Sequence, residues 1–204
     1  TPLPPLLFQQ EPTITQRILI LLGHPASDSF CAALARQYQA SAQEAGHEVR
    51  LITLGDLSFD PILRQGHRQP QPLEPDLLAA QHAITWANRL VLVFPIWWGG
   101  VPALLKGFLD RILLPGFAFR YKSGSPFPEK LLAGRHAHLL VTMDTPPWYY
   151  RWVYAMPGLH QMRRTTLAFC GIRPEKTLTF GPLLSSTPQR RQAWLAQTRA
   201  LALV

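Results

Sequence analysis

Hydrophobic and polar residues along the chain follow two different periodicities. Short, continuous apolar runs are typical of strands that are covered on both faces, and the first such run extends from Arg17 to Gly23. It is followed by apolar residues at every fourth position, Phe30, Leu34, Tyr38 and Ala42. This spacing predicts a helix, and Gly46 is a natural place for it to end.

The same two patterns alternate to the end of the chain. The predicted strands cover residues 17–23, 48–53, 89–94, 137–142 and 176–180, and the predicted helices cover residues 30–45, 76–88, 102–114, 159–169 and 188–203. Such alternation predicts an α/β fold with a parallel sheet and helices on both faces. Five strands favour the doubly wound order 2-1-3-4-5, whose ligand crevice lies where strands one and three end. The segments 23–30 and 94–101 are therefore the expected binding loops.

The domain is expected to span residues 17–204, with no internal repeat and no linker that would divide it. Residues 1–16 are Pro-rich and lack a basic segment followed by an apolar core, so they predict a flexible arm and not a signal peptide. No apolar run reaches the roughly 18 residues that a membrane-spanning helix needs. The chain is therefore not expected to be integral to a membrane, and the cytoplasm is its expected location.

Composition narrows the possible partners. The formal charge is +8 and the pI about 10.1, which raises the possibility of nucleic-acid binding. The basic residues are scattered, however, with tight pairs only at Arg163-Arg164 and Arg190-Arg191. An anionic small molecule is the preferred partner class, and no nucleic acid is expected. Only 16% of residues are charged, which predicts a large buried surface and a homodimer.

No metal site is predicted. The two cysteines, Cys31 and Cys170, do not form a Cys-x-x-Cys pair and are expected to be small buried residues. His136 and His138 would share one face of a strand, but no third ligand accompanies them. Both histidines are interpreted as structural or solvated.

The first expected binding loop contains His24, Ser27, Asp28 and Ser29 ahead of a helix, without a glycine fingerprint for dinucleotides. Free N–H groups at a helix amino terminus bind phosphate, and Ser29 and His24 would add donors. Ordinary helix capping is the alternative interpretation. The position of the loop at the switch point favours phosphate binding.

The second expected loop places Trp97, Trp98, Gly99 and Gly100 at the same crevice. Tryptophan offers a wide apolar surface to a planar ring, and glycine allows the backbone to approach the edge of that ring. Burial in a core or in a subunit interface is the alternative role for the tryptophans. Their place directly after the third strand favours a ring site, where backbone N–H donors would stabilise negative charge on a reduced flavin.

A family resemblance covers residues 17–200. The run Pro95 to Arg111 (PIWWGGVPALLKGFLDR), with His24, Ser29-Phe30, Phe117-Ala118-Phe119 and Phe169-Cys170-Gly171, resembles the NAD(P)H:quinone oxidoreductase (DT-diaphorase-like) family. The resemblance implies a flavodoxin-like homodimer with one flavin per subunit at the dimer interface. It also implies two-electron hydride transfer from NAD(P)H through the flavin to a quinone or a similar acceptor. FAD is the expected flavin, and FMN is the alternative.

The resemblance also implies a set of flavin-binding residues. His24, Ser29, Phe30 and Cys31 would lie along the phosphates, and Pro95, Ile96, Trp97, Trp98 and Gly99 would contact the isoalloxazine. Thr142, Met143, Asp144 and Thr145 would close over its other edge. Arg191 would reach the flavin diphosphate, with an exposed helix arginine as the alternative interpretation.

The acceptor pocket departs from the family pattern. Relatives often carry a Gly-Gly pair followed by a tyrosine and a histidine, whereas this chain reads Asp144-Thr145-Pro146-Pro147-Trp148-Tyr149-Tyr150. Tyr150 falls near the family tyrosine, and His160 is the nearest histidine. Tyr149, Tyr150 and His160 are therefore the candidates for stabilising charge or donating a proton to the acceptor.

Two other functions are compatible with parts of the sequence. Some members of the wider family are ancillary regulatory subunits of potassium-efflux transporters, and the polar connection from Gly55 to Pro75 would suit such docking. An electron carrier such as flavodoxin is the third possibility, although such proteins are usually acidic and this chain is basic. The NAD(P)H-dependent reductase is the leading hypothesis.

Overall fold

The computed structural model describes residues 15–66, 68–125 and 127–203, and five parallel strands form its central sheet. The strands are β1 (Arg17–Leu22), β2 (Glu48–Thr53), β3 (Arg89–Pro95), β6 (His136–Thr142) and β7 (Arg173–Phe180). Their order is β2-β1-β3-β6-β7. This is the predicted doubly wound order, interrupted in sequence by a small hairpin of β4 (Phe119–Arg120) and β5 (Glu129–Lys130) that the sequence pattern did not predict.

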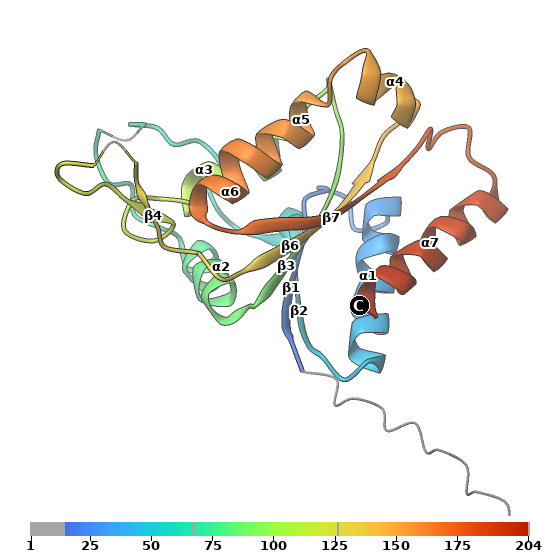
Figure 1. The fold of residues 1–204 in the computed structure, drawn as a ribbon, viewed down its shortest axis with the longest axis horizontal. Coiled ribbons are helices and arrows are strands. Elements are labelled where there is room, and N and C mark those ends of the chain that lie inside the picture. The colour runs from blue at the N-terminus through green and yellow to red at the C-terminus, as the bar shows by residue number, and fades with distance from the viewer. Residues whose placement is uncertain (1–14, 67, 126, 204) are drawn as a thin grey trace, which may run out of the picture.

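Helices cover both faces of the sheet (Figure 1). They are α1 (Phe30–Glu44), α2 (Pro75–Trp86), α3 (Ala103–Ile112), α4 (Pro147–Trp152), α5 (Pro157–His160), α6 (Ala168–Cys170) and α7 (Pro188–Ala202), with a 3-10 turn at Leu54–Asp56. A π-helical segment, Gln161–Leu167, joins α5 to α6. The carboxyl-terminal helix α7 packs beside α1, and α2 packs beside α3.

Alternation along the strands divides the core into two layers. Ile18, Ile20 and Leu22 of β1 pack with buried residues of α1 and α7, whereas Leu19 and Leu21 pack with those of α2 and α3. A parallel strand buried on both faces needs apolar residues at every position, which explains its unbroken aliphatic run. The layered packing fixes where each strand ends and hence where the binding loops lie.

Differences from the predicted elements are concentrated after β6. The predicted helix over 159–169 begins earlier, at Pro157, and widens into the π-helical segment. Helix α4 lies in a stretch that showed no helical periodicity, because six residues are too few to establish one. Pro147 at its first position has the backbone angle that a helix start requires.

The polar connection between β2 and α2 is held by a buried arginine of α3. Arg111 is fully buried, and its guanidinium donates to both carboxylate oxygens of Glu74, at 2.8 and 3.2 Å, to the Pro72 carbonyl at 2.8 Å and to the Asp60 carbonyl. These contacts anchor the connection against α3. The predicted arm, residues 1–16, lies outside the described residues except for Thr15 and Gln16, and the Gln16 carbonyl accepts a hydrogen bond from the Glu48 N–H.

Candidate active site

The candidate site lies where β1 and β3 end side by side. Leu22 pairs with Val93 at the ends of the two strands, and the N–H of Gly23 donates to the Val93 carbonyl at 2.8 Å. From this point the chain passes to α1 on one face and to α3 on the other. The loops that follow the strands therefore meet at one edge of the sheet, as the predicted topology requires.

The loop after β1 folds on itself at the start of α1. The Ser29 hydroxyl accepts from the Ala32 N–H at 3.2 Å and donates to the Ala26 carbonyl at 2.9 Å, so Ser29 caps the helix. His24 Nδ1 accepts from the Ala26 N–H at 2.9 Å, and the His24 ring meets the Trp97 ring edge to face at 5.5 Å. Capping is thus present, and it keeps the N–H groups of the first helical turn directed out of the helix end.

Cys31 joins α1 to the end of β6. Its buried Sγ lies 3.2 Å from the Thr142 hydroxyl. Burial raises the pKa of the Cys31 thiol to about 11, with the Thr142 hydrogen bond opposing the shift. The thiol is therefore neutral and unreactive near pH 7, and only the backbone of Cys31 is available to a ligand.

The loop after β3 is a tight turn with an exposed tryptophan at its tip. The backbones of Trp97 and Gly100 exchange hydrogen bonds at 3.0 and 2.9 Å, and both central residues have positive φ, 51° at Trp98 and 76° at Gly99. Such a conformation suits glycine but is strained for tryptophan. The Trp98 side chain is fully exposed, so its own burial does not compensate for the strain.

Tyr150 and Gly158 hold this turn in place. The Tyr150 hydroxyl is buried and donates to the Gly99 carbonyl at 3.0 Å, and the Gly158 N–H donates both to that carbonyl, at 3.0 Å, and to the Tyr150 oxygen, at 3.1 Å. A side chain at Gly158 would lie 2.9 Å from the Gly99 oxygen, so only glycine allows this approach. Burial raises the pKa of Tyr150, which keeps its hydroxyl protonated.

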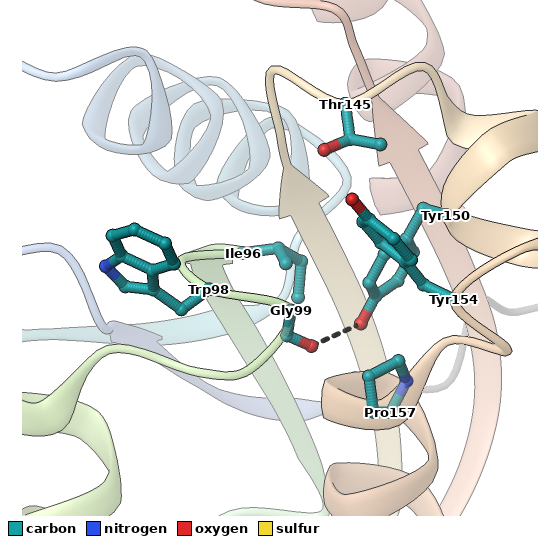
Figure 2. Close-up of a pocket in the computed structure, with 7 residues that line it drawn as sticks. All are labelled: Ile96, Trp98, Gly99, Thr145, Tyr150, Tyr154 and Pro157. Atoms are coloured by element: carbon teal, nitrogen blue, oxygen red, sulfur yellow. Dashed lines mark hydrogen bonds between the residues drawn. The ribbon is translucent and has the colours of Figure 1, made fainter.

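A pocket of about 510 Å³ opens beside the turn (Figure 2). It is lined by Ile96, Trp98, Gly99, Thr145, Tyr150, Tyr154 and Pro157. Its volume falls in the range of small-molecule sites, and its lining is largely aromatic and apolar with a few polar groups. Two of its members, Tyr154 and Pro157, were not among the residues identified from the sequence, because nothing in the sequence showed that the chain after α4 turns back toward β3.

The segment 142–145 spans the end of β6 and the start of the loop after it. Thr142 and Met143 are buried, and the Asp144 carboxylate accepts from the Leu184 N–H at 2.8 Å. Of the four residues identified there, only Thr145 lines the pocket. Asp144 instead ties the end of β6 to the loop that follows β7.

The remaining candidates lie in different places. Tyr149 packs its ring against Tyr154 at 5.1 Å, outside the pocket lining. His160 is exposed and borders a different surface hollow, with Arg163 and Arg164. The Arg191 guanidinium lies 5.8 Å from the Phe30 ring, at the start of α1, and donates to the Ser186 hydroxyl at 2.8 Å. The structure thus brings Arg191 to the predicted phosphate loop but leaves His160 away from the pocket.

The two histidines of β6 have structural contacts. His138 is buried, and its Nδ1 lies 2.9 Å from the Tyr38 hydroxyl. Burial, helped by the charge of Arg89, lowers the pKa of His138 to about 4. Within residues 15–66, 68–125 and 127–203, no group of three His, Cys, Asp or Glu side chains is placed to hold a metal ion. The helices of that same part of the chain include none with the length and hydropathy to cross a bilayer.

Comparison with known proteins identifies the family. A model of the flavodoxin-like fold matches residues 16–202. The chain belongs to the flavodoxin-like family. This flavodoxin-like protein is 30% identical over 182 residues to an uncharacterized NAD(P)H oxidoreductase of Haemophilus influenzae, covering 87% of this chain and 89% of the relative. It is 29% identical over 198 residues to NAD(P)H dehydrogenase (quinone) 1 of Cavia porcellus, covering 81% and 69%.

One solved structure extends the comparison. An FMN-dependent NADH-azoreductase of Bacillus anthracis, determined in complex with FMN, superposes with a TM-score of 0.70 at 20% identity and covers 91% of this chain and 97% of that one. At this identity the similarity establishes the fold alone. The sequence relatives add that this flavodoxin-like protein is a member of the NAD(P)H:quinone oxidoreductase family, as the resemblance suggested.

Proposed function

We propose that this protein is a flavin-dependent NAD(P)H oxidoreductase that passes two electrons as hydride from NAD(P)H, through a bound flavin, to a quinone or a similar small acceptor. The observation that carries the proposal is the strained turn at Trp98 and Gly99 beside the pocket. This conformation costs about 1–3 kcal/mol at Trp98, and strain of this kind is found mainly at functional sites. An exposed tryptophan in a left-handed conformation gains nothing from its own packing, whereas a bound ring would cover it.

The residues present fit a flavin nucleotide. Ile96, Trp98 and Gly99 would contact the ring, with Trp98 offering an apolar surface and Gly99 allowing close backbone approach. The amino terminus of α1 would bind the phosphate next to it, and Arg191 would neutralise further negative charge there. The position of Arg191 favours the diphosphate of FAD over the single phosphate of FMN. When bound, the flavin supplies the redox chemistry, accepting hydride from one substrate and returning it to the other.

Tyr150 and Tyr154 have different roles. The Tyr150 hydroxyl is committed to the Gly99 carbonyl and the Gly158 N–H, so it positions the turn. Tyr154 is half exposed and points its hydroxyl toward Thr145 across the pocket (Figure 2). We therefore assign to Tyr154 the role of donating a proton to the reduced acceptor, a role that the sequence assigned to Tyr149, Tyr150 or His160.

A homodimer remains part of the proposal, because the fully exposed Trp98 offers apolar surface that a second subunit would cover. The cytoplasm likewise remains the proposed location. The relatives above are named as oxidoreductases, and this favours the enzyme over the transporter subunit.

The proposal is tested with the purified protein and one variant. The wild type is expected to bind FAD or FMN, to lose its yellow colour under anaerobic NAD(P)H, and to regain it with a quinone. Mass measurement of the extracted flavin decides between FAD and FMN. Trp98→Gly removes the ring-contacting surface and the backbone strain together, so we expect a protein that is more stable by about 1 kcal/mol but binds flavin more weakly.

Trp152→Ala is the matched control for the variant. It removes an exposed tryptophan that does not line the pocket, and flavin affinity should not change. A wild-type protein that takes up neither flavin nucleotide would refute the proposal.

A further inference from the structure

Aromatic residues gather on the outside of α4 and the turn that follows it. Trp148 is 63% exposed, Trp152 75%, Val153 55% and Tyr154 49%. We call these four residues the α4 patch. In Figure 1, α4 projects at the edge of the molecule, away from the β4–β5 hairpin. Large side chains exposed next to one another in this way mark an interaction site.

The surroundings of the patch are basic. From Thr145 to Pro174 the sequence contains no aspartate or glutamate, whereas Arg151, Arg163 and Arg164 are all exposed. The Arg151 guanidinium lies 5.1 Å from the Trp152 ring centre. A groove of about 610 Å³ between α4 and β7 is lined by Trp148, Arg151, Trp152 and Arg163, among others. The patch therefore combines apolar surface with positive charge.

The patch is also held in a fixed shape. The ring of Tyr149 meets the Trp148 ring edge to face at 5.5 Å and the Tyr154 ring at 5.1 Å. The buried hydroxyl of Tyr150 fastens the underside of α4 to the turn at Gly99. A rigid set of aromatic rings loses little conformational entropy when a partner covers it.

We propose that the α4 patch docks the protein on the anionic surface of a lipid bilayer. Tryptophan and tyrosine favour the boundary between lipid headgroups and acyl chains, where one part of the ring system is apolar and the other is wet. Arginine beside them binds lipid phosphate. Tyr154 belongs to both the patch and the pocket, so docking places the pocket mouth next to the membrane, where apolar acceptors dissolve.

A second copy of this chain fits the patch less well. In a twofold dimer whose axis passes through the patch, the arginines of one copy would lie close to those of the other. No acidic residue of the segment 145–174 is available to compensate that repulsion. An anionic bilayer, by contrast, neutralises all three arginines at once.

The test is sedimentation of the purified protein with vesicles. We expect little binding to phosphatidylcholine alone, and at least about a tenfold rise in the vesicle-bound to free ratio when about 30 mol% phosphatidylglycerol is included at low salt. About 0.5 M NaCl should reverse most of that rise, because it screens charges at the surface. Equal binding to neutral and anionic vesicles, or none to either, would overturn the proposal.

Variants separate the two contributions. Trp148→Ala/Trp152→Ala should weaken vesicle binding by about tenfold or more, because it removes the apolar contact. Arg163→Gln/Arg164→Gln should weaken it by about thirtyfold, since each arginine near the membrane surface contributes roughly 1 kcal/mol and every 1.4 kcal/mol is a factor of ten. The controls are Phe127→Ala and Arg120→Gln, which alter an exposed aromatic and an exposed arginine near the hairpin, and both should bind like the wild type.

The oligomeric state is measured on the same variants by light scattering. If Trp148→Ala/Trp152→Ala converts a dimer to a monomer, the patch is a subunit interface and the membrane proposal is wrong. Flavin content and NAD(P)H turnover in detergent-free buffer should stay at the wild-type level in these variants. Failure to bind vesicles is therefore distinguishable from failure of the proposed oxidoreductase activity.

Discussion

Replacing Tyr150 with phenylalanine tests the assignment of this residue as the one that positions the Trp98–Gly99 turn. The substitution removes one buried hydroxyl and leaves the ring. That hydroxyl donates to the Gly99 carbonyl and accepts from the Gly158 N–H. The carbonyl and the N–H still bond each other at 3.0 Å in its absence, so neither becomes an unpaired buried group.

The expected cost follows from this geometry. Removing the hydroxyl leaves the Gly99 carbonyl and the Gly158 N–H bonded to each other. The loss of stability should therefore be about 1 kcal/mol, because no buried polar group becomes unpaired. We therefore expect Tyr150→Phe to lower the free energy of unfolding by about 1–1.5 kcal/mol. If the looser turn must be ordered again when flavin binds, affinity falls by up to about tenfold, since 1.4 kcal/mol corresponds to a factor of ten. The rate of acceptor reduction by the flavin-saturated enzyme should stay close to that of the wild type.

Urea denaturation and flavin titration of the apoprotein measure the two effects, and Tyr154→Phe is the matched control. That variant also loses one tyrosine hydroxyl from the pocket, but its hydroxyl is the proposed proton donor. It should keep wild-type stability and flavin affinity while acceptor reduction slows and its pH dependence changes. If Tyr150→Phe has wild-type stability and flavin affinity but loses turnover, Tyr150 is the catalytic group and does not act by positioning the turn.

Three further outcomes are expected. Gly158→Ala puts a methyl group 2.9 Å from the Gly99 oxygen, so it should destabilise the fold by about 1–3 kcal/mol and weaken flavin binding, as read by thermal unfolding and titration. His138 is neutral in the fold because burial lowers its pKa to about 4, whereas the unfolded chain protonates near pH 6.5. The free energy of unfolding is therefore unaffected by His138 above pH 6.5 and decreases by up to about 3 kcal/mol as the pH falls toward 4. Urea denaturation of His138→Gln should show a flatter pH profile between pH 6.5 and pH 4. Glu74→Ala should cost about 3 kcal/mol or more in urea denaturation, because it leaves the Arg111 guanidinium buried without its carboxylate.

Each of these outcomes has a counter-result. Asp110→Asn breaks the exposed ion pair with Lys106 and should cost less than about 1 kcal/mol; if it costs as much as Glu74→Ala, burial is not the reason. An unchanged pH slope in His138→Gln would mean that another group is responsible for the acid lability. A Gly158→Ala protein with wild-type flavin affinity would show that the turn does not depend on the approach of α5.

The sequence by itself determined the sheet and which two loops meet at its edge. Strands buried on both faces must be apolar at every position, so the runs at 17–23 and 89–94 were identifiable without any structure. The strand order followed from five strands alternating with helices, and it placed the two expected binding loops at one edge before any contact was known. Both features depend only on short apolar runs and on the order in which strands and helices alternate along the chain, and the sequence displays both directly.

Only the tertiary structure decided which side chains form the pocket. Thr142 ends β6, and Met143 and Asp144 follow it, yet packing places the first two in the core and ties Asp144 to the loop after β7. Tyr154 reaches the pocket because α5 packs closely against the Gly99 turn. The only sign of this close approach in the sequence is Gly158, where a larger residue would collide with the Gly99 carbonyl. The direction of a side chain after a strand depends on where distant segments pack against it, and no periodicity in the chain encodes that arrangement.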